Sequence, residues 1–327
     1  MLDLAFMGKV LPLYYEGALL TLRVGAIGIL LALAVGMVTA VARYWRIPIL
    51  NTAAVIYTEF SRNTPLLVQL FFLYFGLPKV GIRISGEWCA IIGLAFLGGS
   101  YMAEALRAGL ESVSTVQTES ARVLGLTPFQ TMMLVVLPQA FAVSVPPLVA
   151  NIIFLIKEIS VVSAIALPDL MYVTKDLIGN SYKTDESLIL LVSAYVVLLL
   201  PISLLGYWLE KKVRYASISI PKTQYESAQV LGLSKLQTMR LVVLPQAVRQ
   251  LIPPSINLIT RMIKTTSLVV LIGIVEVLKT GQQIIDANRF EYPTAALWVY
   301  GAVFLLYFLA CWPVSLAAKA LEKKWKA

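Results

Sequence analysis

The sequence predicts an all-α, polytopic membrane protein, and three observations predict it: the composition, a series of long apolar runs, and an internal repeat. Of the 327 residues, 59% are hydrophobic and only 14% are charged, with a mean hydropathy of +0.80. Soluble domains average roughly 45–50% apolar and about 25% charged residues. The surplus of apolar side chains must therefore face a bilayer, which excludes an ordinary soluble enzyme.

The charged residues also fit a membrane protein. Lys and Arg number 27 against 18 Asp and Glu, but they lie at the ends of apolar segments rather than in one basic block, so we expect no nucleic-acid partner. Histidine is absent, which removes the commonest general base and zinc ligand, so we expect neither a catalytic residue nor a metal site. Cys89 and Cys311 lie inside apolar runs and are interpreted as packing residues.

Apolar runs near the length of a membrane-crossing helix, about 20 residues, define the predicted spans. Before residue 216 we expect five, at 24–42, about 50–77, 88 to about 106, the stretch after Pro147, and 187–209. The second run is interrupted by Glu59, Ser61, Arg62, Asn63 and Pro65. The aromatic residues at its end, from Phe71 to Phe75, are expected to face lipid or the interface. Gly98 and Gly99 in the third are expected to allow close helix packing.

The distribution of Lys and Arg in short loops predicts the orientation, because cytoplasmic loops are enriched in them. The basic residues that share one side, if the N-terminus is outside, are Arg43, Arg46, Arg107, Arg122, Lys211, Lys212 and Arg214. We therefore expect a multi-pass protein of the cell (plasma or inner) membrane with its N-terminus outside and its C-terminus in the cytoplasm.

An internal repeat divides the chain. Residues 117–165 match residues 224–272 at an offset of 107, with 26 identities in 49 positions and no gap. Each copy runs on into a final span that ends in Glu-Lys-Lys, the second at about 292–318. Nothing in the second copy corresponds to the first three spans. We therefore expect a complete unit at 1–216 and a partial unit at 217–327, which we call the tail, giving five spans plus two.

A loop motif occurs once in each unit, with the pattern Glu-Ser-Ala, three residues, Gly, nine residues, Val-x-Leu-Pro. Its key residues are Glu119, Ser120, Ala121 and Gly125 in the first copy, and Glu226, Ser227, Ala228 and Gly232 in the second. The motif closely resembles the cytoplasmic EAA loop of ABC-importer permeases, with Ser in place of the first Ala. We call the two regions, about 112–137 and 219–244, the coupling loops.

The resemblance covers residues 1 to about 216 as a complete polar amino-acid permease. The segment from Glu59 to Phe72 is similar to that family's second-span signature, and Tyr101 to Gly109 resembles its third span. The resemblance implies the type I importer permease fold, pairing with an identical or different second permease, a dimer of ABC ATPase subunits, an extracytoplasmic solute-binding protein and an amino-acid substrate. The sequence contains no Gly-x4-Gly-Lys-Ser/Thr phosphate loop, so ATP and Mg would bind only to the partner ATPase, and no cofactor is expected in this chain.

Local rules predict the shape of each coupling loop. Ala121 and Leu124, three positions apart, are expected on one face of a short helix that lies against another protein. Gly125 is expected to end that helix in the left-handed conformation. Thr127, followed by Pro128 and Gln130, predicts a capping box, and Ser234 with Gln237 predicts the same device in the tail. A plain connector between spans would have no reason to repeat this spacing, although that alternative remains open.

Charges within the apolar runs are the second informative class, because an ionisable group in hydrocarbon is costly. Arg62, Asn63 and Thr64 mark a place where a helix could restart and receive a substrate carboxylate. Alternatively, and as the favoured interpretation, Arg62 pairs with Glu59 one turn away. Lys157 and Glu158 are further candidates for the substrate path. Lys157 and Lys264 occupy equivalent positions of the repeat, whereas Arg261 faces Phe154 in the alignment.

The leading functional hypothesis is the translocation subunit of an ATP-driven importer of polar amino acids. The alternatives are a secondary transporter driven by an ion gradient and a fusion that only scaffolds partners. The tail either replaces part of a lost partner or is a surplus appendage. We favour the appendage, because two such chains would bring four coupling loops to two ATPase clefts.

Overall fold

The computed structural model describes residues 2–213, 227 and 230–326. Its first helix, α1 (Leu4–Tyr44), is 41 residues long and begins about 20 residues before the predicted span. Asp3 caps it, because its Oδ1 accepts a hydrogen bond from the Phe6 N–H at 2.9 Å. The charges and Pro12 in this first part hid the helix from a search for uninterrupted apolar runs.

The expected second span is broken into two helices. Helix α2 (Leu50–Arg62) ends before Pro65, and α3 (Leu66–Phe71) begins after it. A π-helical turn, η1 (Phe72–Gly76), and a 3₁₀ turn, η2 (Leu77–Val80), follow. Proline has no N–H and disfavours helical geometry in the residue before it, which accounts for the break.

Helix α4 (Gly86–Glu111) packs along α1 through small residues. A Cβ on Gly36 of α1 would lie 2.6 Å from Met102 Cβ, and a Cβ on Gly98 would lie 2.7 Å from Leu155 Cδ1 and 2.8 Å from Ala32 Cβ. Side chains at these positions would push the helices apart. The predicted role of Gly98 in close packing is therefore confirmed.

From α6 onward, the repeat has the same helices in both copies. After α5 (Thr115–Val123), the first copy contains α6 (Pro128–Thr131), η3 (Met132–Val136), α7 (Leu137–Glu158), η4 (Ile159–Ile165), α8 (Leu170–Ser181) and α9 (Thr184–Val213). The tail contains α11 (Lys235–Thr238), η6 (Met239–Val243), α12 (Leu244–Thr265), η7 (Thr266–Ile272), α13 (Val277–Asn288) and α14 (Ala295–Lys326). From α6 to the start of α13 every bound is displaced by 107 residues, which extends the sequence repeat to the backbone.

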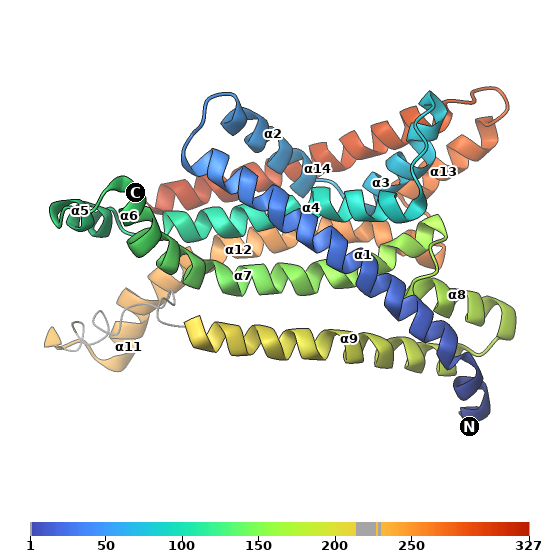
Figure 1. Ribbon diagram of the computed structural model, residues 1–327, viewed down its shortest axis with the longest axis horizontal. Coiled ribbons are helices and arrows are strands. Elements are labelled where there is room, and N and C mark those ends of the chain that lie inside the picture. Colours follow the sequence, from blue (N-terminus) through green and yellow to red (C-terminus); the bar gives the residue numbers. More distant parts are fainter. Residues whose placement is uncertain (1, 214–226, 228–229, 327) are drawn as a thin grey trace.

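The long helices form an elongated bundle (Figure 1). Helices α5, α6 and α11 lie at one end of the bundle together with the C-terminus, and the N-terminus and α8 lie toward the other end. Helix α9 runs along one edge of the view and α14 runs near the opposite edge. The two coupling loops therefore share one end of the molecule, as the sequence predicts.

Five helices in the described part are long and apolar enough to cross a membrane: α1, α4, the continuous α6–η4 segment, α9 and α14. A sixth span is possible if the bent pair Leu258–Ile272 and Val277–Asn288 counts as one. The all-α polytopic class is confirmed. The predicted second span is represented by the shorter apolar helix Leu66–Val80, which follows the break.

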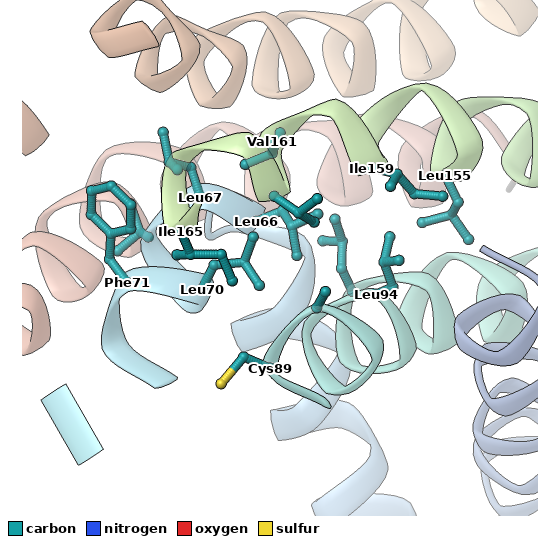
Figure 2. Close-up of a cluster of buried hydrophobic side chains, with 14 of the residues drawn as sticks. Leu66, Leu67, Leu70, Phe71, Cys89, Leu94, Leu155, Ile159, Val161 and Ile165 are labelled. Atoms are coloured by element: carbon teal, nitrogen blue, oxygen red, sulfur yellow. The ribbon is translucent and has the colours of Figure 1, made fainter. Parts of the chain in front are cut away.

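The core joins the two units. Leu66, Leu67, Leu70 and Phe71 of α3 meet Leu94 of α4 and the η4 turn, as Figure 2 shows. The tail adds buried side chains to the same cluster, namely Leu278, Ala296, Tyr300, Val303 and Tyr307. Phe71 is only 1% exposed and its ring lies 5.4 Å from that of Tyr300. The expectation that Phe71 faces lipid was wrong, because the tail covers it. Cys89 and Cys311 are both buried, as expected of packing residues, and both are free thiols.

Candidate functional site

The first coupling loop consists of two short helices joined by a left-handed glycine. Ser114 caps α5, and Gly125 follows that helix with φ +80°. Thr127 Oγ1 accepts from the Gln130 N–H at 3.2 Å, and Gln130 Oε1 accepts from the Thr127 N–H at 2.9 Å. The predicted glycine stop and capping box are confirmed. Because both devices act locally, they fix the angle between α5 and α6.

One expectation for this loop was wrong. Ala121 is buried, at 3% exposed, but Leu124 is 80% exposed and does not share its face. The reason is that α5 ends at Val123, so Leu124 lies at the helix boundary rather than within it. Glu119 and Ser120 are exposed. The exposed surface of this loop therefore consists of polar residues of α5 together with Val123 and Leu124.

The second coupling loop repeats this geometry where it is described. Gly232 has φ +81°, and Ser234 forms the same capping box with Gln237, with distances of 2.9 and 3.3 Å. Ser227 is exposed. Glu226 and Ala228 lie outside the described residues. The loops thus share a glycine stop and a capping box at the same end of the bundle.

A cavity of about 560 Å³ lies between the first unit and the tail. Its walls come from the end of α2, from α4, α7, α12 and α14. The polar residues that line it are Arg62, Asn63, Tyr101, Glu104, Arg107, Asn151, Thr260, Arg261, Lys264, Ser315 and Lys319. Asn151 and Leu258 hold equivalent positions of the repeat and both line it, so the cavity lies between the two copies.

Glu104 is the centre of an ion-pair cluster in this wall. It pairs with Arg43 of α1, with Arg107 at 2.7 Å and with Arg62 at 3.8 Å. The favoured pairing of Arg62 with Glu59 was therefore wrong: Glu59 instead pairs with Lys319 of α14. Arg62 is the last residue of α2, and its guanidinium reaches α4.

The tail places two cations against Tyr101. Lys264 Nζ donates to the Tyr101 hydroxyl at 2.6 Å and to the Arg62 backbone carbonyl at 2.6 Å, and Lys264 is only 7% exposed. The Arg261 guanidinium lies 4.5 Å from the ring centroid of Phe154 and 5.4 Å from that of Tyr101. Positions 154 and 261 are equivalent in the repeat, so the two copies meet here.

The helix break supports the cavity wall with a buried polar network. Thr64 Oγ1 donates to the Phe60 carbonyl at 2.9 Å and accepts from Gln69 Nε2 at 2.9 Å. Thr64 is fully buried and does not line the cavity, whereas Asn63 does. Within the described residues, Asn63 Oδ1 and Gln69 Oε1 are buried without hydrogen-bond partners.

The other substrate-path candidates lie away from this cavity. Lys157 is exposed, and Glu158 is partly buried; neither lines the cavity. From the sequence, Tyr101 and Glu104 were identified only as parts of a span signature, and Lys319 was assigned no role. Glu104 could have been identified as a site residue, because an ionisable side chain within an apolar run marks a candidate functional position.

A second buried polar group lies toward the end of the bundle that holds α8. Asp169 is completely buried, and burial raises the pKa of its carboxyl to about 7, against the lowering effect of the backbone N–H of Tyr172, which donates to Oδ1 at 2.9 Å. Its Oδ2 has no partner among the described residues. At the equivalent position, Glu276 Oε2 accepts from Tyr307 at 3.0 Å.

Long apolar helices around a charged cavity, with a duplicated loop at one end, define a polytopic transport protein of the permease class. The chain belongs to the family of binding-protein-dependent transport system inner membrane components, which it matches twice, over residues 28–215 and 213–327. It is therefore the transmembrane subunit of an ABC importer, a transport subunit rather than an enzyme.

The relatives of this chain match a little over half to about two thirds of it. The chain is 36% identical over 177 residues to the probable glutamine ABC transporter permease protein GlnP of Bacillus subtilis (strain 168), covering 54% of this chain and 81% of the relative. It is 32% identical over 205 residues to the arginine transport system permease protein ArtQ of the same organism, covering 62% and 94%. The crystal structure of an amino acid ABC transporter with histidines matches with 32% identity and a TM-score of 0.61, over 65% of this chain and 99% of the other.

Proposed function

We propose that this chain is the translocation subunit of an ATP-driven importer of polar amino acids, coupled to a separate ATPase dimer through its two coupling loops. The observation that carries the proposal is the duplicated loop geometry at one end of the bundle, with a left-handed glycine and a capping box in each copy. Relatives named for glutamine and arginine transport support an amino-acid substrate. An external solute-binding protein delivers that substrate.

In this proposal the end that carries the coupling loops faces the cytoplasm and the N-terminus faces outside. The exposed Val123 and Leu124 and the polar face of α5 enter a cleft of the ATPase. ATP and Mg bind to that partner. Closure of the ATPase dimer moves α5 and α6, which continue through η3 into α7 and so into the wall of the cavity.

The packing of the tail supports its role as a substitute for part of a partner permease. Helix α14 contributes Tyr300 and Val303 to the shared core, and α12 contributes Arg261 and Lys264 to the cavity. A surplus appendage would have no reason to occupy these positions. The tail thus supplies the second coupling loop and the second wall within one chain.

The test of coupling is Gly125→Val. A β-branched residue is strongly disfavoured at φ +80°, so the substitution should alter the angle between α5 and α6. We expect the purified variant to lose the co-purifying ATPase subunit, and with it ATP-dependent uptake in proteoliposomes.

A matched control is Gly81→Val, which places the same strain at φ +86° in the turn after η2, where no atom lies within 4 Å of the added Cβ, as is also true at Gly125. The Gly81→Val variant should still co-purify with the ATPase subunit. Equal retention of the ATPase by both variants would contradict the proposed coupling role, and loss from both would assign the effect to backbone strain alone.

A further inference from the structure

We propose that Arg261 and Lys264 of the tail make the cavity a site for acidic amino acids, such as glutamate or aspartate, rather than for neutral or basic ones. This inference rests on the proposed function and narrows its substrate class. It is carried by the contacts of these two cations and by the charge of the cavity wall.

The Arg261 guanidinium is held by rings and not by a carboxylate. It lies over Phe154 and Tyr101, and among the described residues it has no hydrogen-bond acceptor and no ion-pair partner. A guanidinium carries five N–H donors in a planar fork that matches a carboxylate in two parallel hydrogen bonds. The two rings hold the guanidinium in place but offer it no carboxylate or carbonyl acceptor, so its N–H donors are available to a ligand.

Lys264 adds a second positive charge beside the first. Its ammonium has three donors, of which two are used by the Arg62 carbonyl and the Tyr101 hydroxyl. The neighbouring cations Arg107 and Lys319 already have carboxylate partners. Arg261 and Lys264 are therefore the lining cations that have no carboxylate within ion-pair distance among the described residues, and Glu158 is the carboxylate that acts on both from outside the lining.

The charge balance of the wall favours an anion. Among the described residues, the lining includes five cations, Arg62, Arg107, Arg261, Lys264 and Lys319, and one carboxylate, Glu104. The balance stays positive when the groups behind the wall are added: Arg43 against Glu59, Glu111 and the partly buried Glu158 gives six cations and four carboxylates. Such an excess of positive charge attracts a net negative substrate and repels a cationic one.

The repeat explains why this property depends on the tail. The first unit has Phe154 where the tail has Arg261, so two copies of the first unit would place a ring at both positions. The volume of about 560 Å³ lies within the range of small-molecule sites, roughly 300–1,000 Å³. The tail thus changes the cavity from aromatic to cationic at the place where the copies meet.

The experiment measures equilibrium binding of radiolabelled glutamate, glutamine and arginine to the purified full chain in lipid nanodiscs. Neither ATP nor a solute-binding protein is added, so a failure of ATPase docking, which would overturn the proposed function, does not affect this measurement. We expect glutamate to bind tighter than glutamine, and glutamine tighter than arginine. Arg261→Phe, which installs the residue of the first copy, should weaken glutamate binding at least tenfold while leaving the melting temperature close to that of the wild type.

Two further variants separate a local from a general effect of charge. Arg261→Lys keeps the charge without the fork and should give an intermediate affinity. Arg289→Gln removes an exposed tail arginine whose guanidinium also lies over a ring, that of Phe290 at 4.6 Å, and should leave binding unchanged. The inference is overturned if arginine or glutamine binds as tightly as glutamate, if Arg261→Phe keeps its affinity for glutamate, if Arg289→Gln has the same effect, or if glutamate does not bind at millimolar concentration.

Discussion

Replacing Lys264 with Met tests whether the tail is fastened to the first unit by a single buried ammonium. Methionine has a similar length and suits an apolar environment, so the change removes the charge and its donors with little loss of volume. It leaves the Arg62 backbone carbonyl and the Tyr101 hydroxyl without their 2.6 Å partner. Both acceptors belong to the first unit, and the donor belongs to the tail.

The expected loss is set by two opposing effects. Each buried acceptor left without a partner costs about 1–3 kcal/mol, whereas the variant no longer has to bury an ammonium. Because Arg62 and Tyr101 also line the cavity, water can partly replace the lost donor. We therefore expect a net destabilisation of about 2–3 kcal/mol, which for a chain of 327 residues lowers the melting temperature by roughly 3–4 °C.

The assay is thermal unfolding in detergent, combined with a double-mutant cycle. Tyr101→Phe removes only the hydroxyl, so the coupling between Lys264→Met and Tyr101→Phe isolates this hydrogen bond, which should be worth about 1.5–3 kcal/mol because its donor is charged. Lys279→Met, a partly exposed lysine of the same tail, is the control and should change the melting temperature little. A coupling near zero, or an equal loss in Lys279→Met, would refute the reasoning.

Three further outcomes are expected. Asp169→Asn can keep the helix cap and should raise the melting temperature at pH 8 but not at pH 4. Because the pKa of Asp169 is raised to about 7, the unfolded chain loses this proton first as the pH rises, and the free energy of unfolding falls by up to about 4 kcal/mol between roughly pH 4 and pH 7. An equal change in melting temperature at both pH values would contradict this. Gly36→Leu should lower the melting temperature by overpacking against Met102, whereas Gly8→Leu, where nothing lies within 4 Å, should not. Truncation after Ala216 should abolish glutamate binding and lower the melting temperature; a shortened chain with unchanged transport and stability would show that the tail is surplus.

The features that the sequence predicted well depend on neighbouring residues. The glycine stop at Gly125 and the capping box of Thr127 and Gln130 are decided within a few residues, so their geometry follows from the residue types alone. The duplication added a second observation of the same pattern at Gly232 and Ser234. The all-α class could be predicted equally well, because a long uninterrupted apolar segment satisfies its backbone hydrogen bonds in a bilayer by forming a helix.

The features that the sequence could not give depend on distant residues. Arg62 and Glu59 lie three positions apart on one helix, yet Arg62 meets Glu104 and Glu59 meets Lys319, 260 residues away. The exposure of Phe71 was misjudged for the same reason, since α14 covers it. Local spacing shows which pairs can form, but only the packing of the helices decides which pairs do form.

The two lysines at equivalent positions of the repeat have different environments. Lys264 is satisfied by α2 and α4 of the first unit, but its twin Lys157 is exposed, because the chain has no second set of the first three spans to receive it. Among the described residues, the surface of α2 and α4 that accepts hydrogen bonds from such a lysine is thus already occupied by Lys264 of the chain's own tail. Two copies of this chain could not satisfy each other's Lys157 without first displacing a tail, whereas a permease with an unoccupied face could receive it directly.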